Sequence, residues 1–174
     1  MKHDNISEKR LKILEYFTEL PAQMLSCDNI ENMIEFVLHC LCSEDCFNLT
    51  KAAYFIDNID FNCLKGIAGY NHSEKFKEPA IWSKPETFTS HMKQCDFNQA
   101  VRGVSRPSAL KAQKADELAK ELGQLLSINN PALYSWKIKY DNYGIFIFEP
   151  IPEAEELNGF ILKGLHLLGF CPMF

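Results

Sequence analysis

The chain has 174 residues, 47% of them hydrophobic, which is enough to build the core of one domain of ordinary size. Its formal net charge is −5, and a mildly acidic surface repels phosphate backbones, so nucleic acid is disfavoured as the main partner. No apolar run reaches the roughly 18–20 residues that span a bilayer, and the polar start of the chain lacks the apolar region of a secretory signal. We therefore predict a single domain over residues 1–174 that is cytoplasmic and has no membrane partner.

Two amphipathic helices are predicted at the start of the chain. The first covers residues 7–26, and Pro21 should kink or split it because proline removes a backbone donor. Asp28, with Glu31 three residues later, is typical of a helix start, and an apolar stripe follows it. Both helices therefore need another element to cover their apolar faces.

A β-hairpin is predicted next. Residues 51–57 form its first strand, residues 58–60 the turn, and residues 61–70 the return strand. The return strand ends in small residues, among them Gly66 and Gly69. Such residues either leave space for a ligand above the sheet or let a helix pack closely against it, and the sequence leaves both possibilities open.

The middle of the chain gives weaker signals. Residues 72–84 are predicted to form a loop, residues 88–100 a helix, and residues 103–110 a segment with a short edge strand. Residues 112–126 are rich in Ala, Leu, Glu and Lys, so we predict a helix there.

A second hairpin and a closing helix are predicted at the end. Residues 133–140 alternate between apolar and polar side chains, and residues 143–148 are apolar on both faces, as in a central strand. The closing helix carries an apolar stripe at helical spacing, formed by Leu157, Phe160, Ile161, Gly164, Leu165 and Leu168.

Three stretches together resemble a GAF domain of the PAS/GAF-like sensory superfamily: KAAYFIDNIDFNCLKGIAGYN, YSWKIKYDNYGIFIFEP and IPEAEELNGFILKGLHLLG. The resemblance covers roughly residues 8–70 and 130–170. It implies an α+β fold in which an antiparallel sheet has the terminal helices on one face and the middle helices and loops on the other. It also implies a non-enzymatic sensory or regulatory domain that binds a small molecule or a protein partner, and a homodimer that forms through the terminal helices.

The residues expected around a ligand follow from strand parity and side-chain chemistry. Arginine suits phosphate or carboxylate through paired hydrogen bonds, and tryptophan stacks on planar groups. The sequence does not identify a cofactor or the ligand itself. The candidate ligand-binding residues are Tyr54, Ile67, Gly69, Trp82, His91, Arg102, Arg106 and Trp136.

One group of residues has the chemistry of a metal site. His39, Cys42 and Cys46 follow each other at helical spacing, with Glu35 four residues earlier, and zinc accepts these ligand types. No paired CxxC motif accompanies them, so we predict no metal site.

Two alternative functions remain open. A thiol-dependent reductase of free methionine sulfoxide would need a reactive thiolate and a partner thiol, for which Cys63 and Cys95 are the candidates. A small acidic chaperone of secreted proteins would instead bind a client segment along strand edges and grooves. The seven cysteines, an odd number, favour reduced thiols over a disulfide framework. The sequence has no P-loop, GxGxxG, GxSxG or HExxH motif, so no catalytic residues are predicted and an enzyme is the less favoured reading.

Overall fold

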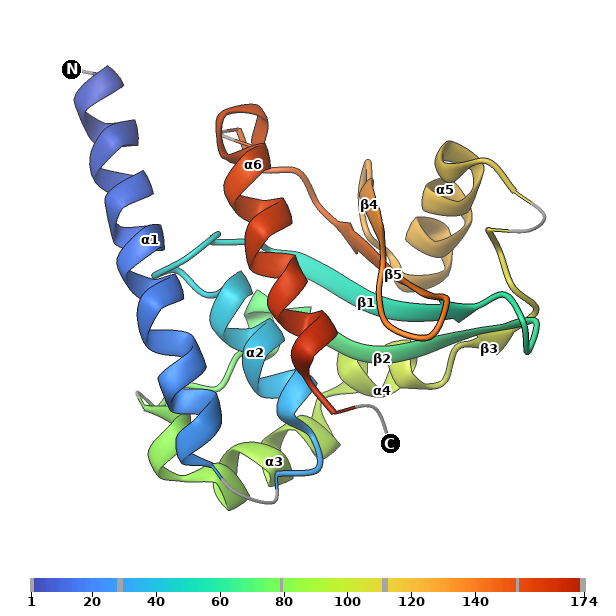
Figure 1. Cartoon of the computed structure of the whole chain (residues 1–174), viewed down its shortest axis with the longest axis horizontal. Coiled ribbons are helices and arrows are strands. Elements are labelled where there is room, and N and C mark those ends of the chain that lie inside the picture. The colour runs from blue at the N-terminus through green and yellow to red at the C-terminus, as the bar shows by residue number, and fades with distance from the viewer. Residues whose placement is uncertain (1, 28–29, 79, 111–112, 153, 173–174) are drawn as a thin grey trace.

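The computed structural model describes residues 2–27, 30–78, 80–110, 113–152 and 154–172, and over these it has six α-helices and one five-stranded antiparallel sheet (Figure 1). The fold class is α+β, as predicted. The strand order across the sheet is β3-β2-β1-β5-β4. In chain order the elements are α1 (Lys2–Ser26), α2 (Met33–Cys42), β1 (Lys51–Asn58), β2 (Cys63–Asn71), α3 (Pro85–Gln94), α4 (Asp96–Arg102), β3 (Ser105–Arg106), α5 (Ala115–Leu126), β4 (Ala132–Lys137), β5 (Asn142–Phe148) and α6 (Ala154–Leu165), with 3-10 turns at His72–Glu74, Ile81–Ser83 and His166–Phe170.

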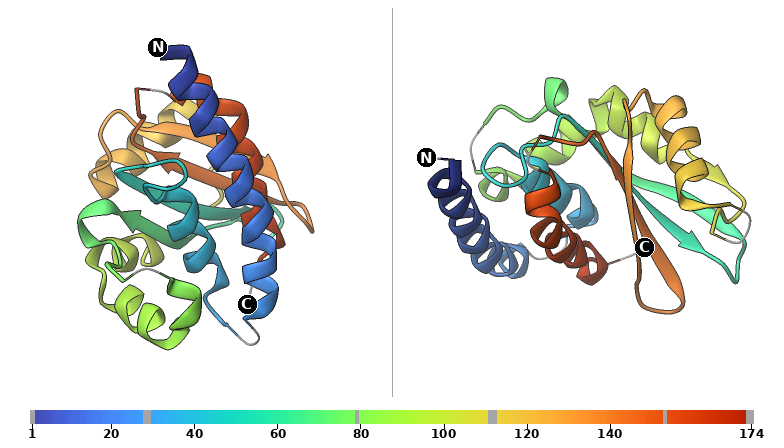
Figure 2. Two further views of the ribbon diagram at one scale, coloured as in Figure 1. Left: turned by 90° about the vertical axis from the view of Figure 1, so that its left-hand side faces the viewer. Right: turned by 90° about the horizontal axis from the view of Figure 1, so that it is seen from above.

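The sheet is covered by helices on both faces (Figure 2). Tyr54 and Phe148 point toward the side of α1, α2 and α6, whereas Phe55 and Ile147 point toward α4 and α5. This alternation follows from the period of two along a strand, and it explains why the central strands β1 and β5 are apolar on both faces. The terminal helices therefore share one face and the middle helices α4 and α5 cover the other.

Helix α3 departs from this division, because it packs on the side of the terminal helices. Its Phe88 lies against Phe36 of α2, with the ring centroids 4.3 Å apart, and both side chains are fully buried. An aromatic pair of this kind adds to the burial of two large apolar surfaces. The predicted helix over residues 88–100 is thus two helices that break at Cys95 and lie over different parts of the core.

A β-bulge interrupts the pairing of β1 with β2. Tyr54 pairs with Ala68 but the next residue, Phe55, pairs with Gly66, so Ile67 is the extra residue on β2. The bulge resets the alternation of side chains along the strand. As a result Gly66 and Gly69 both face α4, while Ile67 packs against the core on the opposite face.

The two glycines of β2 let α4 approach the sheet closely. A Cβ atom on Gly66 would collide with the carbonyl oxygen of Val101, and one on Gly69 would lie 2.7 Å from the Cγ2 atom of Val101. The space above these glycines is therefore filled by α4. Of the two possibilities that the sequence leaves open, close packing of a helix is the one found at this surface.

Several boundaries differ from the sequence prediction. Pro21 lies inside α1 and does not split it into two helices. Asp28 falls outside the described residues, and α2 begins only at Met33. Asn32 precedes that helix without capping it, because its Oδ1 accepts the hydroxyl of Thr89 instead. The two hairpins, the edge strand β3, α5 and the closing helix form where they are predicted, with ends shifted by a few residues. Within the described ranges, no helix combines the length and apolar character needed to cross a bilayer.

Substitution of Gly66 tests the close approach of α4. We expect Gly66→Ala to lower the free energy of unfolding by about 1–3 kcal/mol, because the new methyl group must displace the backbone of α4. Gly159→Ala is the matched control: Gly159 lies in α6 with no atom within 4 Å of an added Cβ, so the change should stabilise the protein by up to about 1 kcal/mol. Urea unfolding measures both, and equal effects of the two changes would contradict the packing described.

Candidate functional site

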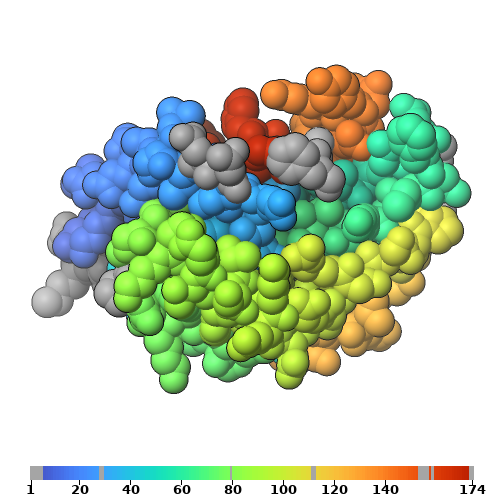
Figure 3. Space-filling view, turned by 90° about the horizontal axis from the view of Figure 1, so that it is seen from below, coloured from blue at the N-terminus to red at the C-terminus, as the bar shows by residue number. Residues whose placement is uncertain are grey.

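A cavity of about 240 Å³ lies where α2, the β1–β2 hairpin, the end of α4 and the C-terminal segment meet. Figure 3 shows this face of the molecule, on which the start of α2 (blue), α3 and α4 (yellow-green) and the C-terminal segment (red) come together. Ten residues line the cavity: Glu31, Asn32, Ile34, Glu35, Ile56, Lys65, Gly66, Ile67, Arg102 and Pro172.

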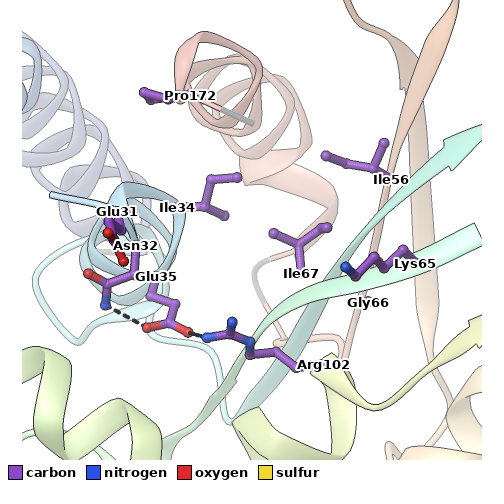
Figure 4. A pocket seen from close by; sticks show the side chains of 10 residues that line it. All are labelled: Glu31, Asn32, Ile34, Glu35, Ile56, Lys65, Gly66, Ile67, Arg102 and Pro172. Carbon is purple, nitrogen blue, oxygen red and sulfur yellow. Dashed lines mark hydrogen bonds and ion pairs between the residues drawn. The ribbon is translucent and has the colours of Figure 1, made fainter. Parts of the chain in front are cut away.

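The carboxylate of Glu35 is the organising group of the cavity wall. Its side chain is only 4% exposed, yet it accepts three hydrogen bonds from side chains. Asn32 donates at 2.6 Å to Oε2, while Asn98 at 3.0 Å and Arg102 at 2.8 Å both donate to Oε1 (Figure 4). A buried charge is tolerated only when it is paired and hydrogen-bonded in this way.

The bonds around Glu35 continue into the sheet and the neighbouring helices. Asn98 is itself buried, and its Oδ1 accepts the backbone N–H of Gly69 at 2.9 Å. The same amide group donates to the carbonyl oxygen of Met92 at the end of α3. On the other side of Glu35, the hydroxyl of Thr89 donates to Oδ1 of Asn32 at 3.1 Å. One network of polar side chains therefore links α2, α3, α4 and β2.

Two cations lie at the rim of the cavity. The Arg102 side chain is about half exposed, at 48%, and only its Nη1 is used by Glu35. Lys65 is exposed on β2, and its ammonium group has no hydrogen bond or ion pair with any residue in the described part of the chain. Figure 4 shows Arg102 and Lys65 on one side of the cavity and Glu31 and Asn32 on the other.

Aliphatic side chains form the rest of the wall. Ile34 comes from α2, Ile56 from β1 and Ile67 from β2, and Pro172 lies across from them. Ile67 faces this cavity by the ordinary alternation of the strand, which puts it opposite Gly66, and the β-bulge then returns Gly69 to the side of α4. The cavity wall therefore combines aliphatic side chains with groups of both charges, so it can contact the apolar and the charged parts of one small molecule.

The ligand-binding residues predicted from the sequence do not converge on one point. Ile67 and Arg102 line this cavity, and Gly69 contributes its N–H to the network behind it. Tyr54 and Trp136 stack on each other in the core, with centroids 5.8 Å apart, and neither lines the cavity at Glu35. The other three predicted residues have partners elsewhere: Arg106 pairs with Glu121, His91 bonds to the carbonyl oxygen of Glu74, and Trp82 packs on Phe36.

Sequence reasoning missed several residues of the cavity wall. The sequence suggests Glu35 only as a metal ligand, and it points neither to Lys65 in the wall nor to Asn98 in the network behind the wall. Asn98 stands 63 residues from Glu35 in the sequence, so no local pattern could connect the two. The one available signal was a carboxylate at position 35 between apolar residues of a predicted buried helix stripe, which calls for a cationic or amide partner.

A second cavity of about 570 Å³ lies between α1, α2 and the segment that follows β2. Tyr16, His39, Tyr70 and Trp82 are among the residues that line it. The imidazole of His39 packs edge-on against the rings of Tyr70 and Phe88, and its Nε2 accepts the backbone N–H of Phe76 at 3.2 Å. Burial, together with the positive charges of His91 and Lys75, lowers the pKa of His39 from 6.5 to about 4.

The two other site types considered from the sequence, a metal site and a pair of reactive thiols, find little support in the described residues. Within the described ranges no group of three or more His, Cys, Asp or Glu side chains could hold a metal ion. Helix α2 ends at Cys42, so Cys46 does not continue its helical spacing. Burial raises the pKa of Cys95 to about 11, which is unfavourable for a thiolate nucleophile. Cys63 starts β2, whereas Cys95 lies near Gly69 toward the other end of that strand.

Comparison with known proteins gives no family assignment. The chain matches no protein-family model, no curated protein and no solved structure. Function must therefore be inferred from the site itself.

The low pKa of His39 predicts a loss of stability on acidification. Between pH 6.5 and pH 4 the folded protein keeps His39 neutral while the unfolded chain binds a proton there, so the free energy of unfolding falls as pH decreases. The contribution of His39 should amount to about 2–3 kcal/mol over this range.

Comparison of two variants isolates that contribution. His39→Gln should lose less stability than the wild type between pH 6.5 and pH 4, whereas His166→Gln, at an exposed histidine, should follow the wild type. Urea unfolding at several pH values measures the difference. Parallel pH profiles for the wild type and His39→Gln would show that His39 is not held neutral by the fold.

Proposed function

We propose that this protein is a non-enzymatic, GAF-like sensory or regulatory domain, and that the cavity beside Glu35 binds a small molecule with a negatively charged group. The observation that carries the proposal is the half-exposed guanidinium of Arg102, which is fixed by the buried carboxylate of Glu35 at the rim of a partly apolar cavity. A guanidinium fixed in place presents its remaining N–H groups to a carboxylate or phosphate at little entropic cost.

The layout of the fold supports a regulatory role. The cavity joins α2 to β2 and α4, and the Glu35 network reaches α3 as well. A ligand that contacts Arg102 and Lys65 would therefore affect the packing of helices from both faces of the sheet, α2 on one face and α4 on the other. A regulatory domain needs this kind of coupling between a bound molecule and the packing of its helices.

The thiol-reductase alternative has less support than ligand binding. Its chemistry needs a thiolate of low pKa and a second thiol nearby, but the pKa of Cys95 is raised and Cys63 lies toward the opposite end of β2. The chaperone-like alternative stays a prediction.

An exposed apolar stripe on α1 favours a protein partner, and we propose that the partner is a second copy of the chain. Leu11 and Leu14 are 58% and 46% exposed. Leu25, which is 83% exposed, lies on the same face of α1 by helical spacing. Helix α6 lies beside α1 and exposes Leu162 (Figure 1). Pairing of these two helices across a two-fold axis would bury the stripe.

A ligand screen tests the binding proposal. At a concentration one hundred times its Kd, a ligand adds about 2.7 kcal/mol of stability, which should raise the melting midpoint by several degrees. We expect at least one compound from a panel of carboxylates, phosphates, cyclic nucleotides and amino acids to do so in differential scanning fluorimetry. Arg102→Met should remove most of the ligand-induced shift, whatever its effect on the melting midpoint of the free protein.

Arg106→Met is the matched control for this screen. Arg106 is the other predicted anion-binding arginine, but it is paired with Glu121 and does not line the cavity. Its replacement should leave the ligand-induced shift intact. The proposal fails if no compound raises the midpoint, or if the shift depends on Arg106 and not on Arg102.

Light scattering after size-exclusion chromatography tests the dimer. The wild type should have twice the 20.0 kDa mass of the chain, and Leu11→Glu combined with Leu14→Glu should give a monomer. Leu125→Glu changes an equally exposed leucine on α5, at 60%, and should leave the dimer intact. A wild-type monomer at about 100 μM, or dissociation caused by Leu125→Glu, would contradict pairing through α1.

A further inference from the structure

The wall of the cavity presents opposite charges side by side. The carboxylate of Glu35 and the guanidinium of Arg102 are 2.8 Å apart, with the exposed Glu31 beyond one and the exposed Lys65 beyond the other. An α-amino acid carries an ammonium and a carboxylate on the same carbon, so it presents the matching charges in reverse order. From this complementarity, and resting on the ligand-binding function proposed above, we infer that the cavity takes an aliphatic α-amino acid.

The carboxylate end of the ligand is read by Arg102 and Lys65. A guanidinium has five N–H donors. Glu35 accepts a hydrogen bond from only one of the three guanidinium nitrogens of Arg102, Nη1. Lys65 adds three donors that have no partner in the described residues. Together they supply a charge-assisted site that a planar carboxylate can bridge.

The ammonium end is read by Glu35 and Glu31. An ionised carboxylate has about four acceptor positions, and Glu35 uses three of them, two on Oε1 and one on Oε2. Among the described residues no donor occupies the fourth position, on Oε2, which is the oxygen on the Asn32 side of the cavity (Figure 4). Glu31 lines the same side, so an ammonium placed there meets two carboxylates.

The side chain of the ligand is read by the isoleucines. Ile34, Ile56 and Ile67 form a wall with no hydrogen-bonding atoms in its side chains, which disfavours polar side chains on the ligand. The cavity volume of about 240 Å³ lies below the range usual for drug-sized ligands. Leucine, isoleucine and valine match this small volume and its aliphatic wall.

A charge-matched series of ligands tests this inference in isothermal titration with the wild-type protein. Leucine has both charges, 4-methylpentanoate lacks the ammonium, and 3-methylbutylamine lacks the carboxylate. Each missing charge should lower the affinity at least tenfold, because it removes charge-assisted hydrogen bonds. Glutamate and lysine should bind at least tenfold more weakly than leucine, because each would place a charged side chain against the isoleucines.

Two surface substitutions should act on opposite ends of the ligand. Lys65→Met should lower the affinity for leucine and for 4-methylpentanoate and leave the affinity for 3-methylbutylamine unchanged. Glu31→Gln should lower the affinity for leucine and for 3-methylbutylamine and leave the affinity for 4-methylpentanoate unchanged. Both residues are exposed, so the fold should tolerate either change, and Lys93→Met at an exposed site on α3 serves as the control that alters none of the affinities. A structural disturbance would not produce this crossed pattern.

The outcomes separate this inference from the broader proposal. Equal binding of leucine and its two singly charged analogues, or stronger binding of glutamate, would overturn the assignment of an aliphatic amino acid. If leucine, isoleucine and valine all fail while another anion binds in an Arg102-dependent manner, the ligand class is wrong and the regulatory site stands. If no ligand binds in either experiment, both fail together.

Discussion

The cavity depends on one buried negative charge. The carboxylate of Glu35 lies inside an otherwise apolar helix face, where a charge without partners would cost several kcal/mol. Asn32, Asn98 and Arg102 supply the compensating hydrogen bonds, and each must be held within about 3 Å of the carboxylate. This requirement fixes the end of α4 against the start of α2, and the cavity is the space left beside that junction. A salt bridge of this kind is costly as a source of stability, so its presence is better explained by the positions it imposes on the groups around the cavity.

The sheet makes this junction possible through its smallest residues. Gly66 and Gly69 allow α4 to lie against β2, which brings Asn98 and Arg102 within reach of Glu35. The bulge at Ile67 lets both glycines face α4, while Ile67, on the opposite face, lines the cavity from the same short stretch of strand. Three residues of β2, Gly66, Ile67 and Gly69, therefore shape both the polar and the apolar part of the site. The space above Gly66 and Gly69 is filled by α4, and the cavity forms beside this contact.

The parts of the fold that local patterns control could be predicted from the sequence, and the site largely could not. The two hairpins, α5 and the closing helix follow from alternation, helix propensity and turn residues, which act over a few neighbours. The placement of α3 beside α2, and with it the break between α3 and α4 at Cys95, depends on the distant contact of Phe88 with Phe36, which no local pattern in the sequence indicates. The bulge inverted the parity expected at the end of β2, as a one-residue slip does to every side chain beyond it. Arg102 could be proposed from its chemistry, but its partner Glu35 lies 67 residues away.

The most direct test of the central claim is a double-mutant cycle between Glu35 and Asn98, which are both buried and 3.0 Å apart. The free energy of unfolding is measured for the wild type, Glu35→Ala, Asn98→Ala and the double variant. If the carboxylate is held by the amide of Asn98, the two changes should be coupled by about 1.5–3 kcal/mol, the worth of a hydrogen bond to a charged group. Effects that add within about 0.5 kcal/mol would show that Glu35 does not depend on this contact, and the account of how the cavity is built would be wrong.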